Sequence, residues 1–424
     1  MQGYYTYPDD HPAKPRTKRI AVVTQGQKLG DETRGYTRYR YIAELLAQEG
    51  FEVDLITSTF QHWDKAQRDT TRACYQNLPY RLQFVYEPGY KRNLDLVRIN
   101  SHRVFANNLK RLFKSRFSDN SHAYDLIYSE IPPNDMARVC AETAAKYGIP
   151  YVVDVNDLWP EAMRMAVDVP VLSDVAFAPF ARDAHRVYNL ISGAVGTSDE
   201  YANRPTADRE APYAKRTVYV GNELAVFDAG AQEHAGEIEK PDGEFWVTYA
   251  GTLGASYDIE TLIDAAVIAA QSDPCIRVKL LGDGPDRQRL EEHAAKVGAP
   301  VDFVGYAPYD LMAAYLCASD VTVNSLVSSA AQSIVTKIGD YLAAGIPLIN
   351  TGSSPEFRGK VEADGFGTNV PAEDPQALAA AILAFASDPD LCAQMGARAR
   401  TVAEEQFDRK RSYQEIVSLV RELL

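Results

Sequence analysis

Short runs of apolar residues alternate with longer amphipathic segments along most of the chain. Residues 19–24 (RIAVVT) form the first apolar run, and residues 37–50 (TRYRYIAELLAQEG) follow with helical spacing and a glycine where a helix would end. Residues 51–57 (FEVDLIT) are the next apolar run. A strand, a helix and a second strand in this order predict a βαβ unit with parallel strands.

The same alternation recurs in both halves of the chain. In the first half we expect strands at 124–129, 150–155 and 193–197 and a helix at 136–148. In the second half we expect strands at 245–250, 276–281, 301–304, 321–324 and 347–350, with helices near 258–271, 285–297, 309–317, 335–344 and 375–386. Strands that alternate with helices imply parallel sheets covered on both faces.

A polar segment separates the two halves. Residues 227–244 lack an apolar period, which is typical of a linker. Since 424 residues exceed what one core usually holds, we expect two Rossmann-like, doubly wound α/β domains, at 1–226 and 245–408, facing a central cleft. A terminal helix at 409–424 would return to the first domain. Ligands of such folds usually bind at the carboxyl ends of the strands.

Composition and charge narrow the classes of function. The chain is 46% hydrophobic and 24% charged, as globular proteins are, and it has no apolar run of membrane-spanning length. Residues 1–19 lack the apolar centre of a secretory signal, so we expect a cytoplasmic protein. A net charge of −14 argues against nucleic acid as a partner. The five cysteines lack metal-ligand spacing and no Asp-x-Asp motif occurs, so we expect no metal.

Two glycine turns follow expected strands of the second half. Gly251-Thr252-Leu253-Gly254 comes after residues 245–250, and Gly282-Asp283-Gly284 comes after residues 276–281. Such glycines let backbone amides approach an anion at a helix N-terminus. A tight strand-to-helix turn without a ligand explains each of them equally well.

Residues 332–347 (QSIVTKIGDYLAAGIP) place small and polar residues ahead of a helix. The Lys337 ammonium and nearby backbone amides could hold a diphosphate, while Asp340 could accept hydrogen bonds from ribose hydroxyls. The alternative is a surface lysine and an exposed acid. The amides in question belong to Ser333, Ile334, Val335 and Thr336.

Several motifs of the second half together resemble the GT4 glycosyltransferases of bacterial capsule, exopolysaccharide and O-antigen assembly, which have the GT-B fold. The matching stretches are GTLG at Gly251, GDGP at Gly282, FVGY at Phe303, ASDVTV at Ala318 and DYLAAGIP at Asp340. The resemblance implies a retaining transferase that uses a UDP- or GDP-linked sugar. It also implies donor contacts from Gly251, Thr252, Gly282, Gly284, Tyr306, residues 333–337 and Asp340.

The first half resembles the family less closely. Arg34-Gly35-Tyr36 is similar to a reduced form of the family's glycine-rich turn after the first strand, on the acceptor side. Residues 154–161 (DVNDLWPE) resemble a stretch of a capsule and exopolysaccharide subgroup. The resemblance makes Asp157 a candidate acceptor-side base and places Glu161 beside it. Alternatively, Asp157 only caps a helix and Trp159 packs in the core.

The chain also departs from the family pattern. Many members have Glu-x7-Glu, whereas here Gln332 stands at the first position and Asp340 at the second. A neutral Gln332 can bond hydroxyls but cannot stabilise positive charge at the anomeric carbon. The Arg and Lys that often follow the Gly251 turn are absent, so neutralisation of the diphosphate as it leaves would fall chiefly to Lys337.

We therefore expect transfer of a sugar to a glycan or polyprenyl-linked acceptor in surface polysaccharide synthesis. Two other hypotheses stay open: a non-hydrolysing nucleotide-sugar epimerase, which shares the architecture, and a scaffold that lost catalysis. A Rossmann dehydrogenase is disfavoured because the first strand is not followed by GxGxxG.

Lys91 to Phe117 is the one strongly basic stretch, with eight cations against the single acid Asp95 and interleaved apolar residues. This pattern could dock on anionic lipid at the inner face of the cell membrane, near a lipid-linked acceptor. The alternative is a solvated helix with one buried stripe.

Overall fold

The computed structural model describes residues 17–424 except 34–36, 94, 119–122, 162–171 and 331–333. The chain forms two compact units, residues 1–152 with Leu424 and residues 153–423. The division falls inside β7 (Tyr151–Val155). Among the described residues, no helix combines the length and the apolar character that a membrane span requires.

The first unit contains four parallel strands in the order β5-β2-β1-β6. Their bounds are β1 (Arg19–Val23), β2 (Glu52–Ser58), β5 (Arg81–Val85) and β6 (Leu126–Ile131). Residues 20–23 of β1 are completely buried, because this strand lies between two others and both its faces are covered. The strands expected near 19–24, 51–57 and 124–129 are therefore confirmed.

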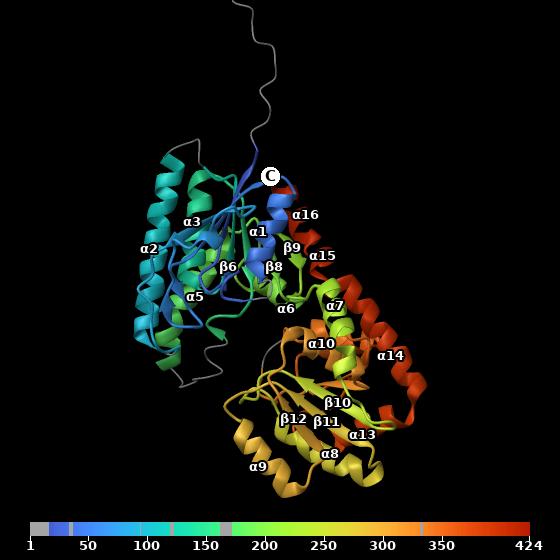
Figure 1. Ribbon diagram of the computed structural model, residues 1–424. Helices are drawn as coiled ribbons and strands as arrows, with labels where there is room; N and C mark the ends of the chain where they lie inside the picture. Colours follow the sequence, from blue (N-terminus) through green and yellow to red (C-terminus); the bar gives the residue numbers. More distant parts are fainter. Residues whose placement is uncertain (1–16, 34–36, 94, 119–122, 162–171, 331–333) are drawn as a thin grey trace, which may run out of the picture. The chain divides into compact units, whose positions relative to one another are not determined.

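Three helices cover the strands of the first unit (Figure 1): α1 (Arg38–Gln48), α2 (Leu96–Ser118) and α3 (Asn134–Tyr147). Helix α2 packs along α3 and buries Phe105, Leu109 and Phe113. A small hairpin of β3 (Phe60–Gln61) and β4 (Ala66–Gln67) follows β2, and the turn η1 (Ala73–Tyr75) comes before β5. The apolar periodicity did not predict this hairpin, because its strands have only two residues each.

The second unit begins with β7, β8 (Gly193–Gly196) and β9 (Ala214–Thr217), in this order in the sheet. The connecting elements are α5 (Leu172–Leu190), α6 (Asp199–Asn203) and η3 (Arg204–Ala207). The last helix, α16 (Gln414–Leu423), packs on β8 and β9. Arg216 of β9 forms ion pairs with Glu415 and Glu422 of α16, at 3.1 and 2.8 Å. The expected return of the terminal helix is thus confirmed.

A six-stranded parallel sheet forms the rest of the second unit, in the order β12-β11-β10-β13-β14-β15. Its strands are β10 (Phe245–Ala250), β11 (Ile276–Leu281), β12 (Val301–Gly305), β13 (Val321–Asn324), β14 (Leu348–Asn350) and β15 (Gly367–Asn369). The first five were expected from apolar runs. β15 has three partly exposed residues, too few for such a run.

Two hydrophobic cores lie on the two faces of this sheet. One is formed with α8 (Ile259–Ser272), α9 (Arg287–Val297) and α13 (Pro375–Ser387). The other is formed with α7 (Leu224–His234), α10 (Tyr309–Ala318), α11 (Ile338–Ala343), α12 (Pro355–Asp364) and α14 (Pro389–Val402). Figure 1 shows α8 and α9 on one side of β10 to β12, and α7 with α10 on the other. The predicted doubly wound arrangement is confirmed here.

The segment expected as a linker is partly helical. Helix α7 occupies its first eight residues, and the turn η4 (Ala235–Glu237) follows. Phe227 is fully buried and Gly230 lies against Asp310 of α10, so the helix is held by a narrow apolar stripe. Three buried positions in eleven residues, one of them a glycine, are too few for sequence periodicity to predict a helix. The domain limits at 226 and 245 stay a prediction.

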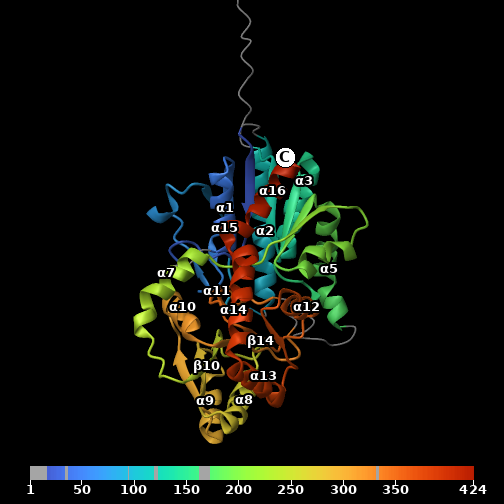
Figure 2. The same cartoon turned by 90° about the vertical axis from the view of Figure 1, so that its right-hand side faces the viewer.

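The C-terminal region is a series of helical segments rather than one helix from residue 409. Helix α14 continues into the π-helical turn η5 (Ala403–Phe407), followed by α15 (Arg409–Ser412) and α16. Figure 2 shows α14, α15 and α16 one after the other. At η5 the helix contacts the segment that precedes α7. There the Asn222 amide donates a hydrogen bond to the Phe407 carbonyl oxygen at 3.0 Å.

Candidate functional site

The loops that follow β10, β11 and β12 meet at one edge of the second sheet, because parallel neighbouring strands end on the same side. Main-chain hydrogen bonds tie these loops together. The Gly251 amide donates to the Leu281 carbonyl oxygen at 2.9 Å, and the Gly282 amide donates to the Gly305 carbonyl oxygen at 2.7 Å. The Leu253 amide similarly donates to the Asp283 carbonyl oxygen at 3.0 Å. The three loops form one connected rim.

The glycines of this rim are needed for packing between its loops. A Cβ on Gly282 would lie 1.8 Å from the Gly251 carbonyl oxygen, and one on Gly284 would lie 2.1 Å from the Leu253 carbonyl oxygen. Gly282 also has a φ of +132°, which side-chain-bearing residues rarely adopt. The alternative of a tight turn that needs no ligand is therefore sufficient to explain Gly282 and Gly284.

The Lys337 ammonium group lies against this rim. Its Nζ is 4.0 Å from the ring centroids of both Tyr249 and Tyr257. A Cβ on Gly251 would lie 2.8 Å from the same nitrogen, so this glycine makes the close approach possible. The nitrogen is buried and has no hydrogen-bond partner among the described residues. Among the described residues, the Lys337 amine is thus buried against two aromatic rings and forms no hydrogen bond.

The electrostatic state of Lys337 follows from this setting. Burial lowers its pKa well below the ordinary value for a lysine. A buried polar group without a partner is costly, so such groups usually point to function or strain. A phosphate oxygen brought to this nitrogen would satisfy it and restore its charge. The sequence-based alternative of a solvated surface lysine is wrong for this residue.

Asp340 lies on α11 and makes contacts different from those expected. Its Oδ1 accepts hydrogen bonds from Asn222 Nδ2 and from the Tyr309 hydroxyl, both at 2.8 Å. Burial raises the pKa of Asp340, and these two hydrogen bonds oppose the shift. One carboxylate oxygen therefore joins α11 to α10 and to the segment before α7. The role of Asp340 toward a ribose stays a prediction.

The remaining predicted donor residues lie around the rim. Thr252 is exposed, and Tyr306 is 80% exposed directly after β12. Ile334, Val335 and Thr336 form the loop that precedes α11, where the Ile338 amide donates to the Val335 carbonyl oxygen at 3.1 Å. Gln332 and Ser333 lie outside the described residues. The replacement of glutamate by Gln332 is therefore known only from the sequence.

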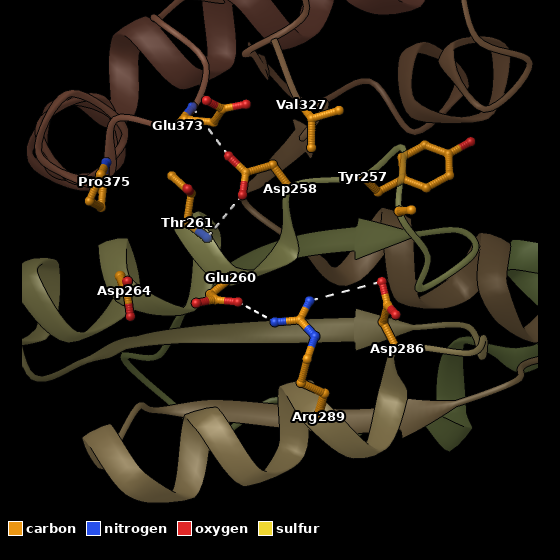
Figure 3. Close-up of a pocket in the computed structure, with 11 residues that line it drawn as sticks. Tyr257, Asp258, Glu260, Thr261, Asp264, Asp286, Arg289, Val327, Glu373 and Pro375 are labelled. Atoms are coloured by element: carbon orange, nitrogen blue, oxygen red, sulfur yellow. Dashed lines mark hydrogen bonds and ion pairs between the residues drawn. The ribbon is translucent and has the colours of Figure 1, made fainter. Parts of the chain in front are cut away.

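An acidic pocket of about 430 Å³ lies beside Tyr257 (Figure 3). Its five carboxylates and one arginine belong to Asp258, Glu260, Asp264, Asp286, Glu373 and Arg289. Most are engaged locally: Asp258 accepts the amides of Thr261 and Glu373, and Glu260 pairs with Arg289. The excess of carboxylates would repel a diphosphate, so this pocket is a poor site for one. Among the described residues, no group of three or more acidic, histidine or cysteine side chains could hold a metal.

The first-half candidates Asp157 and Glu161 follow β7. Asp157 Oδ1 accepts the Leu158 amide at 2.8 Å, and its Oδ2 accepts Trp159 Nε1 at 3.0 Å. Burial raises the pKa of Asp157. Trp159 is partly buried, and its ring meets Phe180 edge-on at 6.3 Å, so the role of Asp157 and the alternative that Trp159 packs in the core both stay predictions.

Glu161 forms a 2.6 Å ion pair with Arg204 of η3 and has one buried oxygen without a partner among the described residues. The other first-half candidates, Arg34, Gly35 and Tyr36, lie outside the described residues.

Sequence reasoning missed the residues that surround the two candidate ionisable groups of the second half. Tyr249 and Tyr257 enclose Lys337, and Asn222 and Tyr309 hold Asp340. Tyr249 reads as one more apolar residue of a buried strand, so only a three-dimensional structure shows its ring beneath a cation.

Solved structures with the same architecture define the class of fold. HepE of Anabaena, crystallised with UDP, aligns with a TM-score of 0.68 and 15% identity over 96% of this chain and 100% of its own. Sucrose-phosphate synthase of Thermosynechococcus elongatus aligns with a TM-score of 0.66 and 19% identity, over 96% of this chain and 99% of its own. WaaG, a glycosyltransferase involved in lipopolysaccharide biosynthesis, aligns with a TM-score of 0.61 and 12% identity, over 94% of this chain and 99% of its own. The predicted GT-B fold is confirmed.

Residues 231–402 match the family Glycosyl transferases group 1, so the chain carries a domain of this family. A protein of Escherichia coli (strain K12) named as a colanic acid biosynthesis glycosyltransferase, WcaL, is 30% identical over 194 residues. That match covers 44% of this chain and 47% of WcaL, about half of each. The resemblance to polysaccharide glycosyltransferases is confirmed at this level.

Proposed function

We propose that the protein is a retaining glycosyltransferase that moves a sugar from a UDP- or GDP-linked donor to a glycan or polyprenyl-linked acceptor in surface polysaccharide synthesis. The observation that carries the proposal is the buried Lys337 nitrogen beside Gly251, which has no hydrogen-bond partner in the part of the chain that the structure describes. The family match over residues 231–402 and the UDP and UDP-glucose in the crystal structures of HepE support a nucleotide-sugar donor.

The proposed chemistry assigns the diphosphate to Lys337. Negative charge develops on the diphosphate as the anomeric bond breaks, and the Lys337 ammonium, which regains its proton when the donor binds, stabilises that charge. The two tyrosine rings keep water from the ammonium, which strengthens its interaction with the leaving group. We propose that this cation, and not a metal ion, neutralises the diphosphate, so that chelation of divalent cations leaves the rate unchanged.

Asp157 is the proposed base for the acceptor hydroxyl. Its carboxylate is held by the Leu158 amide and the Trp159 indole, which fix its orientation. Burial raises the pKa of Asp157, so its carboxyl group loses its proton at a higher pH than an ordinary aspartate does. Only above that pH can Asp157 act as a base. The pH dependence of the rate should report this raised pKa.

The transfer reaction tests the proposal directly. Incubated with UDP- and GDP-sugars and a lipid-linked glycan fraction, the protein is expected to release nucleotide only when acceptor is present. Asp157→Asn is expected to lower kcat about 100-fold or more, with unchanged nucleotide affinity and without the acidic limb of the pH profile.

Asp302→Asn, which removes a surface carboxylate paired with Lys279, is the matched control and should keep full activity. A donor sugar altered in the absence of acceptor would instead identify an epimerase. Binding of nucleotide without turnover of any donor would identify a scaffold.

We also propose that α2 brings the protein to an anionic membrane surface at the inner face of the cell membrane. Leu96 is 81% exposed at the start of α2, next to the exposed Val97, and the exposed cations Arg103, Lys110 and Lys114 follow along the helix. Near its end, α2 and α3 border a cavity of about 500 Å³. The cavity is lined by four cations and one acid, which is Glu142. Glu142 is paired with Arg138 at 3.2 Å, so the cavity keeps a positive character.

Vesicle co-sedimentation tests this docking. The protein is expected to bind phosphatidylglycerol vesicles at low salt, to ignore phosphatidylcholine vesicles, and to dissociate as ionic strength rises. At about 1 kcal/mol for each near-surface cation, reversal of two charges in Lys110→Glu/Lys114→Glu should weaken binding at least 30-fold. The control Lys296→Glu/Arg398→Glu changes two exposed cations of the second unit and should bind normally. Equal binding of both double variants would contradict a role for α2.

A further inference from the structure

Basic and aromatic side chains gather at the carboxyl edge of the sheet in the first unit. Strands β5, β2 and β1 are parallel neighbours, so the loops that follow them lie side by side. The loop after β1 supplies Lys28, the β3–β4 hairpin supplies Trp63 and Lys65, and the connection from β5 to α2 supplies Tyr90. Arg98 comes from the first turn of α2. We call these five residues the basic-aromatic edge.

Two cations of this edge converge on one ring. Lys65 Nζ lies 4.9 Å from the Tyr90 ring centroid, and the Arg98 guanidinium lies 5.4 Å from it. Lys65 also donates to the His62 carbonyl oxygen at 2.6 Å and to Asn93 Oδ1 at 2.7 Å. Both of these acceptors are neutral, so no carboxylate neutralises Lys65 among the described residues.

The acids of the neighbouring loops are already engaged. The buried Glu87 accepts the hydroxyls of Ser58 and Ser101, at 2.6 and 2.8 Å. Glu32 pairs with Arg68 at 2.6 Å. Asp31 likewise pairs with Arg72, whereas Asp64, Asp69 and Asp95 accept hydrogen bonds from neutral donors. Among the described residues, Lys28 and Lys65 form an ion pair with none of these acids, so both side chains are available to an anionic ligand.

The histidine within the edge adds no compensating charge. His62 is hydrogen-bonded to the Tyr90 hydroxyl. Burial, with the nearby Lys65 and Arg98, lowers the pKa of His62 to about 4, so the ring is neutral at pH 7. Lys65 itself has a positive φ of 54°, in the left-handed region that non-glycine residues seldom occupy. Such backbone conformations concentrate at ligand sites.

Trp63 gives the edge a flat apolar surface. Its side chain is 61% exposed, although tryptophan is usually well buried. Lys28 Nζ lies 5.5 Å from the indole centroid, and the His62 ring meets the indole edge-on at 5.1 Å. A fixed, exposed indole is suited to stacking on the C–H face of a sugar ring, while the cations beside it suit an anionic substituent on that ring.

We infer that the basic-aromatic edge binds the acceptor, with a sugar ring stacked on Trp63 and a negatively charged group adjoining that ring held by Lys28, Lys65 and Arg98. This inference rests on the proposed transferase function and specifies its acceptor as an anionic sugar. The negative group is a phosphate, as in a sugar diphosphate lipid, or a carboxylate, as in an acidic glycan. Both have the same chemistry at the edge.

Binding of small probes tests the inference and distinguishes a phosphate from a carboxylate as the negative group of the acceptor. Glucose 1-phosphate, methyl glucuronide and methyl glucoside are titrated into the full chain saturated with UDP and followed by saturation-transfer NMR and tryptophan fluorescence. At least one anionic probe is expected to bind tenfold or more tightly than methyl glucoside, a difference of about 1.4 kcal/mol. The tighter of the two anionic probes identifies the phosphate or the carboxylate as the preferred group.

Variants locate the probe. Lys65→Gln is expected to remove the preference for the anionic probe, and Trp63→Ala to weaken all three probes about tenfold, whereas Lys296→Gln in the second unit should change neither. UDP affinity should stay unchanged in all three variants, which also shows that they fold. Equal affinity for the neutral and anionic probes, or full affinity in Lys65→Gln, would overturn the inference. Failure of the wild-type protein to bind UDP would instead count against the proposed function.

Discussion

Replacement of Lys337 by methionine is expected to weaken nucleotide binding at least tenfold and to stabilise the ligand-free protein. The side chains have similar volume, so the packing against Tyr249 and Tyr257 is kept. The variant loses the contact to the diphosphate, and its affinity for UDP or GDP should fall at least tenfold, about 1.4 kcal/mol. It also loses a buried nitrogen without a partner, which should raise the free energy of unfolding by about 1 kcal/mol.

The protonation of Lys337 provides an independent readout of the same prediction. Since burial lowers its pKa in the ligand-free protein, nucleotide binding should draw a proton onto Lys337. Calorimetry in buffers of different ionisation enthalpy would measure this uptake. The unfolded chain keeps the proton in the window between the lowered folded pKa and the ordinary lysine value. The free energy of unfolding should therefore rise with pH across that window, and Lys337→Met should lose this dependence.

Lys279→Met is a close control for both experiments. Lys279 also lies over an aromatic ring, 4.1 Å from the Trp246 centroid, but it is paired with Asp302 at 2.5 Å. Its loss should leave nucleotide affinity unchanged and should not stabilise the protein. Unaltered UDP and GDP binding by Lys337→Met would remove the main support for the proposed donor site.

Gly284→Ala is expected to destabilise the second unit by more than about 3 kcal/mol, the range of severe overpacking. The added methyl group would lie 2.1 Å from the Leu253 carbonyl oxygen, a main-chain atom that cannot move without the loop that carries it. Gly282→Ala should be at least as severe, because it adds a 1.8 Å clash to a positive φ. Thermal unfolding would measure the loss of stability in both variants. In a unit of this size, each kcal/mol should lower the melting temperature by roughly 2–4 °C.

A third glycine of the same rim provides the contrast. A Cβ on Gly254 would meet its nearest neighbour, the Thr252 methyl group, at 3.6 Å, an ordinary contact. Gly254→Ala should therefore unfold within about 2 °C of the parent protein. Similar melting temperatures for Gly254→Ala and Gly284→Ala would show that the close approach of the two loops does not control stability.

Much of the second sheet could be predicted because its central strands are buried along most of their length. β10, β11 and β13 occupy the same residues as the apolar runs at 245–250, 276–281 and 321–324. Strands covered on both faces cannot include solvated residues, so their sequences are nearly continuous apolar runs. The elements that were missed lack this property. The hairpin of β3 and β4 is too short to show a period, and α7 buries only a narrow stripe.

The candidate site was predictable in its residues but not in its contacts. The sequence motif indicated Lys337 and Asp340 as candidates. The same motif is equally compatible with two solvated side chains, so the sequence alone could not decide between the two. What distinguishes Lys337 is the placement of Tyr249 and Tyr257, and the partners of Asp340 come from residues 222 and 309. Such pairs depend on how distant segments cross, which no local period encodes.

The connected rim of the second sheet also indicates where donor choice can be redesigned. Main-chain bonds among the loops after β10, β11 and β12 fix their backbones relative to one another. Thr252, Asp283 and Tyr306, by contrast, are exposed, and the Asp283 carboxylate contacts only its near neighbours in sequence, the Gly284 amide and the Arg287 guanidinium. A library that varies these three positions and keeps the glycines would sample new sugar preferences on an intact scaffold.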